Sequence, residues 1–368
     1  MRILATILFL LAAAAAQAAV RQTEAGPVEV TEVASGLDTP WGLAFLPDGG
    51  FLVTERDGRL WHFGADGGRQ QVRGVPKVAT TGQGGLLDVL VPRDFAQSRQ
   101  VYLSYAHRQG GGAGTAVGVG RLSRDGRRLA EFRRIFEMAP GSRGGRHFGS
   151  RLVEARDGTL FVTIGERGDR PAAQDLGRSQ GSILRITRGG APAPGNPFLG
   201  QPGARPEIWS YGHRNPQGAA LDGAGQLWAV EHGAQGGDEV NRIRAGANYG
   251  WPVISYGRHY SGGKIGEGTA QDGMEQPQHY WDPSIAPSGL AILSGNLLPG
   301  WDGDFLIGSL KFDLISRLEQ RGGGLVEVER LTWPETERVR DVRQAPDGSV
   351  WFLSEGHGAI YRIAPAGR

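Results

Sequence analysis

The sequence contains no cysteine, so no disulfide bond can stabilise the fold. It also lacks an excess of either charge, because 40 Lys and Arg residues nearly balance 38 Asp and Glu residues. No dense basic run with interleaved aromatic residues occurs, which argues against a nucleic-acid partner. Cysteine sets and histidine pairs at the spacing of zinc sites are missing as well. Stability must therefore come from a hydrophobic core or from other bound ions.

Long hydrophobic runs are also missing, apart from Ile3 to Ala16 near the start of the chain. Arg2 precedes this run, and the small-x-small sequence Ala16-Gln17-Ala18 follows it, as in a secretory signal peptide. The run is too short to span a bilayer comfortably. We therefore predict a signal peptide over residues 1–18 that is cleaved after Ala18. The mature protein, residues 19–368, is expected to be periplasmic or secreted, without a membrane span, and to form a single domain.

Glycine is abundant, with 61 residues, and no convincing amphipathic helix occurs, which favours many tight turns. One pattern recurs: an apolar segment, an Asp-Gly type of turn and an alternating strand, as in Leu227 to Val230. Its four clearest copies and two weaker ones are Leu43 to Phe63, Ser150 to Asp169, Gly218 to Gly233, Val339 to Ile363, Arg99 to Ala106 and Gly303 to Leu318.

Six such units indicate radial repetition of small sheets, and we predict an all-β, six-bladed β-propeller with four-stranded antiparallel blades. A pair of β-sandwiches is the alternative, less favoured because the repeat continues without a linker. Two segments resemble insertions. Gln109 to Gly120 is predicted to be an exposed hairpin tip, and Gly257 to Pro283 a long loop over one face.

Loops from every blade of a propeller converge at one end of its axis, so candidate residues far apart in sequence can share a pocket. His147 precedes the start of a blade and is a candidate general base, because its pKa lies near working pH. A loop histidine bonded to backbone is the alternative. Gln83 lies in a Gly-rich loop, where its amide can approach a ligand, although an ordinary turn fits equally. Glu166 and Arg167 follow a strand, and a solvent-exposed turn is their alternative interpretation.

Several cations lie near the starts of the later blades. Arg338 and Arg340 are two residues apart and would share one face of a strand. Together with Lys311 and Arg214 they would form a pocket for an anion with several carboxylates. In the alternative interpretation, Arg338 and Arg340 pair with neighbouring Glu residues on a sheet surface.

The loop from Gly233 to Glu239 combines carboxylates with exposed backbone, and Tyr249 follows it. Oxygen ligands of this kind suit a hard cation such as Ca²⁺. The spacing does not match an EF-hand, so a calcium site here is one interpretation of a Gly-rich acidic loop.

Taken together, these stretches resemble the soluble pyrroloquinoline quinone (PQQ)-dependent sugar dehydrogenases, in particular their periplasmic aldose sugar dehydrogenase branch. The resemblance runs from about Val30 to Ile363. Its motifs, in the order of the family, are GQGGLL from Gly82, the His147 loop with Thr163 to Gly165, GHRNPQG from Gly212, GGDEVN from Gly236, NYGWP from Asn248, APSG from Ala286, GSLK from Gly308 and RVRDV from Arg338.

The resemblance implies a six-bladed propeller and roles for individual residues. His147 matches the base that removes the proton from the anomeric hydroxyl, and Glu166 is our candidate for the residue that orients it. Backbone carbonyls of Gly233 and Ala234 would bind one Ca²⁺, and Glu239 with Tyr249 a second, structural one. The positions that match cofactor-holding residues are Gln83, Arg214, Asn215, Tyr260, Lys311, Arg338 and Arg340.

Two departures from the glucose dehydrogenase branch occur. That branch has Gln-Gly-Pro where this chain has His232-Gly233-Ala234, a change that backbone ligation should survive. It also has Asp-Gln in place of Glu166-Arg167, which affects the group that orients His147. Because the resemblance assigns the role of base to His147, His213 and His232 are not expected to be the base.

The resemblance implies an enzyme that oxidises the anomeric carbon of aldose sugars to lactones, with PQQ and Ca²⁺ as cofactors. A Ca²⁺-dependent lactonase-type hydrolase and a non-catalytic sugar-binding propeller are the alternatives. The expected partners are a small aldose substrate and an electron acceptor of unidentified nature. The preferred sugar and the choice between monomer and homodimer stay open at this point.

Overall fold

The computed structural model describes residues 18–295 and 297–367. Nearly all of the predicted signal peptide lies outside the described residues. Six antiparallel sheets account for the regular structure, and the helices in the described ranges are short: α1 (Phe95–Ser98), η1 (Arg170–Gln174) and η2 (Pro334–Thr336). No helix in these ranges is long and apolar enough to cross a membrane.

Each sheet is one blade, numbered here in chain order. Blades 1 and 2 consist of β3 (Pro40–Phe45), β4 (Phe51–Glu55), β5 (Arg59–Phe63), β6 (Arg69–Gln71), β7 (Leu86–Leu90), β8 (Gln100–Gln109), β9 (Gly112–Leu122) and β10 (Leu129–Glu137). Blades 3 and 4 consist of β11 (Leu152–Glu154), β12 (Leu160–Ile164), β13 (Ser182–Ile186), β14 (Ile208–Tyr211), β15 (Pro216–Leu221), β16 (Leu227–Glu231), β17 (Asp238–Arg242) and β18 (His279–Trp281).

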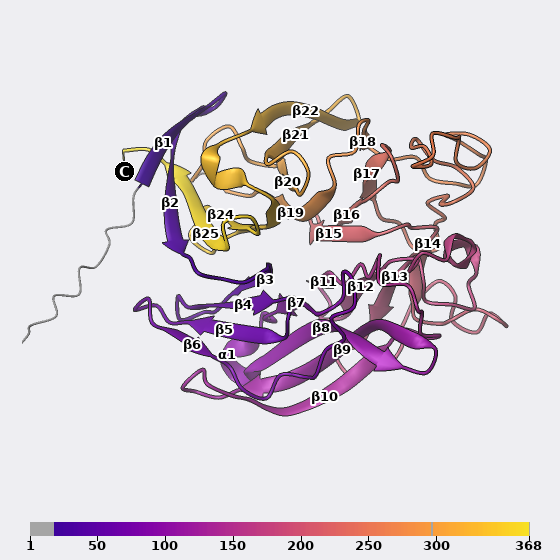
Figure 1. Cartoon of the computed structure of the whole chain (residues 1–368), viewed down its shortest axis with the longest axis horizontal. Helices are drawn as coiled ribbons and strands as arrows, with labels where there is room; N and C mark the ends of the chain where they lie inside the picture. The colour runs from indigo at the N-terminus through magenta and orange to yellow at the C-terminus, as the bar shows by residue number, and fades with distance from the viewer. Residues whose placement is uncertain (1–17, 296, 368) are drawn as a thin grey trace, which may run out of the picture.

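Blade 5 consists of β19 (Pro287–Ile292), β20 (Phe305–Ser309), β21 (Ile315–Arg321) and β22 (Gly324–Leu331). Blade 6 has five strands instead of the predicted four: β23 (Val339–Gln344), β24 (Val350–Ser354), β25 (Ala359–Pro365), β2 (Gly26–Ala34) and β1 (Ala18–Thr23). The innermost strands contact one another in the ring order β3, β7, β11, β15, β19 and β23, and β23 contacts β3. Figure 1 shows them converging near the centre of the molecule. The predicted six-bladed β-propeller is thereby confirmed.

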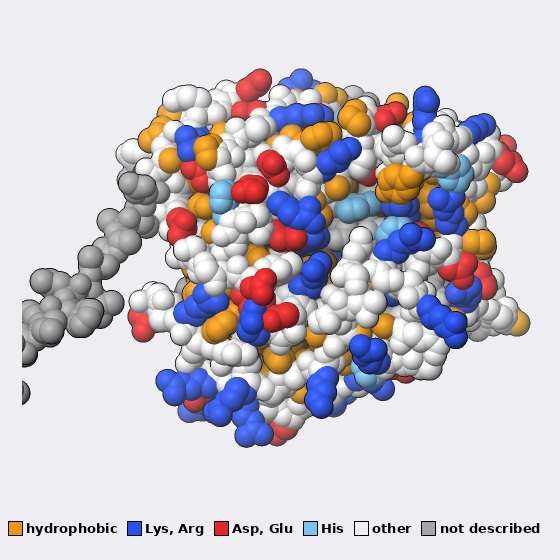
Figure 2. All heavy atoms as spheres, in the orientation of Figure 1, with side chains coloured by type: hydrophobic (Ala, Val, Ile, Leu, Met, Phe, Trp, Pro, Cys, Tyr) orange, Lys and Arg blue, Asp and Glu red, His pale blue; other side chains and the backbone are white. Residues whose placement is uncertain are grey.

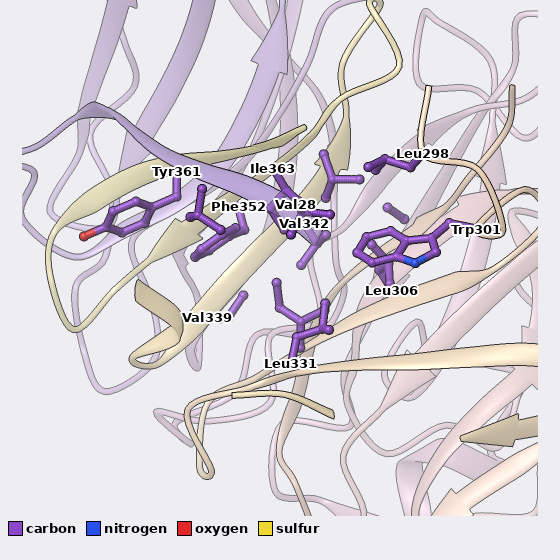
Figure 3. Close-up of a cluster of buried hydrophobic side chains, with 14 of the residues drawn as sticks. Val28, Leu298, Trp301, Leu306, Leu331, Val339, Val342, Phe352, Tyr361 and Ile363 are labelled. Atoms are coloured by element: carbon purple, nitrogen blue, oxygen red, sulfur yellow. The ribbon is translucent and has the colours of Figure 1, made fainter. Parts of the chain in front are cut away.

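The ring is closed by pairing the two ends of the chain. β2 is antiparallel to β25, with Val30 opposite Ile363. Val28 and Val30 are buried in a cluster that also contains Phe352 and Ile363, and Figure 3 shows Val28 beside Ile363. Burial of each such aliphatic side chain stabilises the fold by about 1.5–3 kcal/mol. The N-terminal strands therefore hold the last blade to the rest of the ring.

In four of the six blades the second strand is buried along its whole length. β4, β12, β16 and β20 contain no exposed residue, so the alternation expected between Trp228 and its neighbours does not appear as alternating exposure. Both faces of such a strand pack against neighbouring blades. The turns follow the predicted Asp-Gly chemistry. In the turn before β12, for example, Gly158 adopts a φ of 81° and Asp157 accepts a hydrogen bond from the Thr159 amide at 3.0 Å.

The prediction for Gln109 to Gly120 was wrong. Most of this segment is strand β9, which is largely buried, and only Gly110 and Gly111 form the tip. Its glycines permit close packing instead of exposure: a Cβ at Gly118 would lie 2.3 Å from the Phe132 ring, and one at Gly120 would lie 2.6 Å from Leu129. The second predicted insertion, Gly257 to Pro283, is a long loop that ends in β18.

Charged side chains fill the axis of the ring. Arg151 is buried and contacts Asp88 at 2.8 Å and Asp341 at 3.2 Å, and Arg343 contacts both carboxylates at 3.1 and 2.9 Å. Arg151 also donates to the Gln217 carbonyl oxygen at 3.0 Å. The four residues come from blades 2 and 6 and the loop before β11. They tie distant blades together beneath the end of the axis where the candidate residues gather.

Candidate active site

A cavity of about 570 Å³ opens at one end of the axis. Figure 2 shows Lys, Arg and His side chains around a hollow on the viewed face. The sequence-predicted residues that line the cavity are Gln83, Asn215, Gly233, Ala234, Tyr260, Lys311, Arg338 and Arg340. They belong to different blades or to the loops between blades, as the convergence argument required. His147, Glu166, Arg214, Glu239 and Tyr249 lie beside or behind this wall.

His147 lies in a tight loop immediately before Phe148 and Gly149, which do line the cavity. Its φ of 55° is unusual for a residue with a side chain, and such a conformation persists only where the surroundings enforce it. The His147 amide donates to Oε1 of Gln83 at 2.7 Å, and the Gly149 amide donates to Oδ1 of Asn215 at 3.2 Å. Two predicted cofactor residues therefore also hold the histidine loop.

The imidazole of His147 is paired with a carboxylate. Its Nδ1 lies 2.6 Å from Oε1 of Glu166, which is 1% exposed. Burial lowers the pKa of His147, the hydrogen bond with Glu166 opposes that shift, and the Arg214 charge lowers the pKa further. A carboxylate accepts the proton of Nδ1, so the neutral ring keeps an unprotonated Nε2. The geometry suits a general base.

Arg167 follows Glu166 in the sequence, but its side chain packs against Phe148 instead of hydrogen-bonding to His147. Its guanidinium stacks on the ring of Phe148 at 3.3 Å and donates to the carbonyl oxygens of Gly144 and Arg146. Burial lowers the pKa of Arg167 to about 10. Neither residue is the exposed charged turn of the alternative interpretation. Arg167 instead fixes the loop that carries His147.

Arg214 lies behind the cavity wall, between blades 3 and 4. It donates to the His232 carbonyl oxygen at 3.1 Å, and its guanidinium lies over the Trp251 ring at 5.2 Å. Its buried Nε has no hydrogen-bond partner in the described part of the chain. Burial lowers the pKa of Arg214, and nearby Tyr260 raises it. Tyr260 itself is 75% exposed at the cavity, so it lies at the mouth.

Arg338 and Arg340 share one carboxylate. Glu355 lies 2.8 Å from Nε of Arg338 and 2.7 Å from Nη2 of Arg340. Arg340 also donates to Oε1 of Gln217 at 3.2 Å. The alternative interpretation therefore identified the pairing with Glu but not the place, because both arginines line the cavity instead of an outer sheet surface. One negative charge compensates two positive ones, so a net positive charge faces the cavity.

The Gly-rich acidic loop is organised around Asp238. This buried carboxylate accepts from the Gly233 amide at 2.8 Å, the Ala286 amide at 2.8 Å and the Ser284 hydroxyl at 2.7 Å. Its oxygens therefore shape the loop. Gly233 and Ala234, which line the cavity, offer a cation only backbone oxygens, which suit Ca²⁺.

Glu239 has no cationic partner within the described ranges. Burial and the nearby charge of Glu231 raise the pKa of Glu239, and Asn241 donates to both carboxylates at 3.1 Å. A cation would relieve this repulsion. Tyr249 borders the same small space, but its hydroxyl donates to the Arg242 carbonyl oxygen at 2.6 Å and accepts from the Arg244 amide at 2.9 Å. A ligand from Tyr249 would therefore be its backbone carbonyl. Within the described ranges, no three His, Cys, Asp or Glu residues cluster as a metal site.

The side chains of His213 and His232, which were not expected to be the base, make structural hydrogen bonds. His213 is fully buried, with Nδ1 at 2.8 Å from Glu231 and Nε2 at 2.9 Å from the Ser210 hydroxyl. His232 lines the cavity, but its Nε2 donates to the Pro287 carbonyl oxygen at 2.7 Å, and burial lowers its pKa to about 3. Both ring nitrogens of His213 are thus occupied.

Sequence reasoning missed Glu355, Trp41, Arg56 and Gln217. A signal for Glu355 does exist, because a Glu ends or follows the second strand in four blades: Glu55, Glu166, Glu231 and Glu355. Each accepts a hydrogen bond from the segment just before the first strand of its own blade: from the Asp38 amide, His147, His213 and Arg338, respectively. The repeat therefore carries a recurrent carboxylate at the end of the blade that faces the cavity.

Comparison with known proteins agrees with this architecture. The chain is 45% identical over 345 residues to the aldose sugar dehydrogenase YliI of Escherichia coli, covering 92% of this chain and 93% of that protein. Its structure is similar to that of the soluble aldose sugar dehydrogenase from Escherichia coli in the apo form, with a TM-score of 0.89, 44% identity and coverage of 92% and 99% of the two chains.

A PQQ-bound aldose sugar dehydrogenase from Streptomyces coelicolor is also similar, with a TM-score of 0.77 and 30% identity, covering 95% of this chain and 99% of that one. The family described as Glucose / Sorbosone dehydrogenase matches residues 37–362. The chain therefore belongs to the Glucose / Sorbosone dehydrogenase family.

Proposed function

We propose that this chain is a PQQ-dependent aldose sugar dehydrogenase that oxidises the anomeric carbon of aldoses to lactones. Membership of the dehydrogenase family makes it an oxidoreductase. The observation that carries the proposal is the placement of a buried His147–Glu166 pair, at 2.6 Å, beside a cavity with a positively charged wall. A base and an anion site in one place are what this reaction requires.

The cavity residues fit PQQ, which is a tricarboxylate. Arg338 and Arg340 retain a net positive charge after pairing with Glu355, and Lys311 has no carboxylate partner among the described residues. The buried Nε of Arg214 has no acceptor among residues 18–295 and 297–367. Lysine and arginine are the side chains that bind carboxylates most strongly. Together with the amides of Gln83 and Asn215 and the phenol of Tyr260, these groups would hold the cofactor.

The fit for Ca²⁺ rests on the oxygen donors around residues 233–249. Backbone oxygens of Gly233 and Ala234 would bind one ion at the cavity wall. The half-buried carboxylate of Glu239, with the Tyr249 carbonyl oxygen, would bind a second, structural ion. When bound, PQQ supplies the hydride acceptor and Ca²⁺ supplies a Lewis acid for the quinone carbonyl.

The protein's own contribution is positioning and proton transfer. Nε2 of neutral His147 would accept the proton of the anomeric hydroxyl as the hydride leaves the anomeric carbon, and that carbon becomes the lactone carbonyl. Glu166 would keep Nδ1 protonated and stabilise the imidazolium that forms. Arg167 and Gln83 would hold the loop, so that the base does not move away from the substrate.

The proposal includes export of the chain to the periplasm or beyond, by a leader over residues 1–18, and a single catalytic domain from Ala19 onward. A direct test mixes purified apo-protein with PQQ, Ca²⁺ and an artificial dye acceptor and supplies a panel of aldoses. We expect dye reduction that depends on both PQQ and sugar. If every aldose leaves the dye unreduced while sugar lactones are hydrolysed, the chain is a hydrolase instead. Sugar binding without either reaction would indicate a non-catalytic propeller.

A further inference from the structure

Arg56 lines the same cavity, although neither the motifs nor the family resemblance assigns it a role. It lies in the β4–β5 hairpin of blade 1, within the segment Thr54-Glu55-Arg56-Asp57-Gly58-Arg59, in which residues 56–58 form the turn. This segment contains two acids and two arginines. Which acid pairs with which arginine decides whether Arg56 is free to bind a ligand.

Both acids of this segment pair with Arg59. Glu55 contacts Nε of Arg59, and Asp57 lies 2.8 Å from its Nη1. Asp38 adds a third contact with Arg59 at 3.1 Å. No carboxylate pairs with Arg56 in residues 18–295 and 297–367. The carboxylates of this segment therefore neutralise Arg59, which lies away from the cavity. The positive charge of Arg56, at the cavity wall, is not neutralised by any of them.

The structure holds Arg56 firmly in this place. Its amide donates to the Thr39 carbonyl oxygen at 3.1 Å, and its carbonyl oxygen accepts from the Leu86 amide at 3.0 Å. Gly85, with a φ of 148°, packs so closely that a Cβ there would lie 1.9 Å from the Arg56 oxygen and 2.5 Å from its Cγ. The loop that carries Gln83 therefore rests on the backbone and the stem of Arg56. Such packing restricts the side chain without using its guanidinium.

The position in the ring is also informative. Blade 1 lies between blade 6, with Arg338 and Arg340, and blade 2, with Gln83, because β3 contacts both β23 and β7. Arg338 and Arg340 share the charge of Glu355, whereas Arg56 has no carboxylate partner in the part of the chain that the structure describes. An unpaired guanidinium that is held in place beside a cavity is suited to bidentate binding of a carboxylate.

We propose that Arg56 is a further carboxylate-binding residue of this cavity. This inference rests on the proposed function. The carboxylate belongs either to PQQ or to an acidic aldose such as a uronic acid, and the two sources are separable by experiment. In the first case Arg56 adds to the affinity for the cofactor. In the second it selects sugars that carry an acidic group.

The test compares Arg56→Gln with Arg59→Gln, which removes the same charge from the same segment but away from the cavity. PQQ affinity of the apo-protein is measured by quenching of tryptophan fluorescence, since Trp41 lines the cavity. The kcat/KM values for glucose and glucuronate are then measured at saturating PQQ. Loss of a charged hydrogen bond predicts a roughly 10- to 100-fold effect in Arg56→Gln only.

A higher Kd for PQQ with an unchanged ratio of the two sugars assigns the carboxylate to the cofactor. An unchanged Kd with a selective loss on glucuronate assigns it to the substrate. The inference is overturned if Arg56→Gln changes neither the Kd nor the ratio of the two sugars. It is also overturned if Arg59→Gln changes these quantities as much as Arg56→Gln does. Arg56→Lys provides a second variant: it keeps the charge and should lose several-fold less than Arg56→Gln, whereas equal losses would indicate a packing role and overturn the inference.

PQQ binding and aldose oxidation by the wild-type protein distinguish failure of this inference from failure of the proposed function. If the wild-type protein binds PQQ and oxidises aldoses while Arg56→Gln behaves normally, only the role of Arg56 fails. If it does neither, the proposed function fails and the role of Arg56 fails with it.

Discussion

Glu166 and His147, which are 19 positions apart, form a buried pair with 2.6 Å between Oε1 and Nδ1. The same arrangement recurs one blade later, where Glu231 lies 2.8 Å from Nδ1 of His213. The two pairs differ at the other ring nitrogen. Nε2 of His213 is bonded to the Ser210 hydroxyl. Nε2 of His147 has no hydrogen-bond partner among the described residues, and His147 lies in a strained loop beside the cavity. One repeated structural unit has thus produced a packed histidine and a candidate base.

Replacement of the base should separate chemistry from binding. We expect His147→Ala to lower kcat by about 10²–10⁴-fold, the usual contribution of a general base, and to leave the Kd for PQQ nearly unchanged. Stopped-flow dye reduction and fluorescence titration measure the two quantities. His213→Ala is not a neutral control, because His213 is buried. A normal turnover number per bound PQQ in His147→Ala would refute the assignment.

The pH profile should report the pKa of His147. Burial lowers this pKa below the ordinary imidazole value of 6.5, so the base stays neutral at pH 6.5 and kcat/KM should fall only at lower pH. The interaction with Glu166 raises the pKa of His147. Glu166→Gln should therefore move the acid limb to still lower pH and reduce kcat. An unchanged limb in Glu166→Gln would show that another group controls the profile.

Lys311 should contribute to cofactor affinity. Because it lines the cavity without a carboxylate partner in the described ranges, Lys311→Ala is expected to weaken PQQ binding by about 10-fold or more. Lys264→Ala is the matched control. Lys264 is exposed on the long loop, and among the described residues its ammonium group donates only to the Glu267 carbonyl oxygen. Titration of both apo-proteins with PQQ distinguishes them, and equal affinities would exclude Lys311 from the anion site.

Calcium should stabilise the protein through Glu239. Ca²⁺ at 100-fold its Kd is expected to add about 2.7 kcal/mol to the free energy of unfolding. In Glu239→Gln, which removes the carboxylate proposed to bind the ion, this increment should largely disappear. Chemical denaturation with and without a chelator measures it. A full increment in Glu239→Gln would place the structural ion elsewhere.

The charged axis predicts a stability effect. Arg151→Met leaves Arg343 as the remaining shared partner of the buried carboxylates of Asp88 and Asp341, and removal of one member of a buried ion pair costs about 3–5 kcal/mol. Arg362→Met is the control, since its pair with Asp347 is largely exposed and should contribute less than about 1 kcal/mol. Urea denaturation compares the two variants. Equal losses would mean that the axial network adds little.

Much of the fold followed from local patterns. Asp-Gly turns and recurrent apolar strands predicted six blades, because turn chemistry and strand propensity act over a few neighbouring residues. The same reasoning failed for Gln109 to Gly120. Its glycines were interpreted as an exposed tip, but they accommodate Phe132 and Leu129 of the adjacent strand β10. That contact is between strands, so composition alone did not reveal it.

The site was predicted unevenly for a similar reason. The structure gathers the residues proposed to hold PQQ around one cavity. However, the Tyr249 hydroxyl is bonded to backbone, and Arg338 and Arg340 pair with Glu355 at the cavity and not with Glu residues on an outer sheet surface. A spacing of two residues predicted that the arginines share a face. The same spacing could not predict which carboxylate the two arginines would contact.

By itself, the sequence determined the repeat, the number of blades and the kinds of side chain available to the site, since these depend on short-range patterns. The tertiary structure decided which charges are neutralised. Glu55 and Asp57 are both adjacent to Arg56 in the sequence and farther from Arg59, but both pair with Arg59. The difference arises because closure of the ring places Arg56 against Gly85 and the cavity, and only the distances in the closed ring determine that choice.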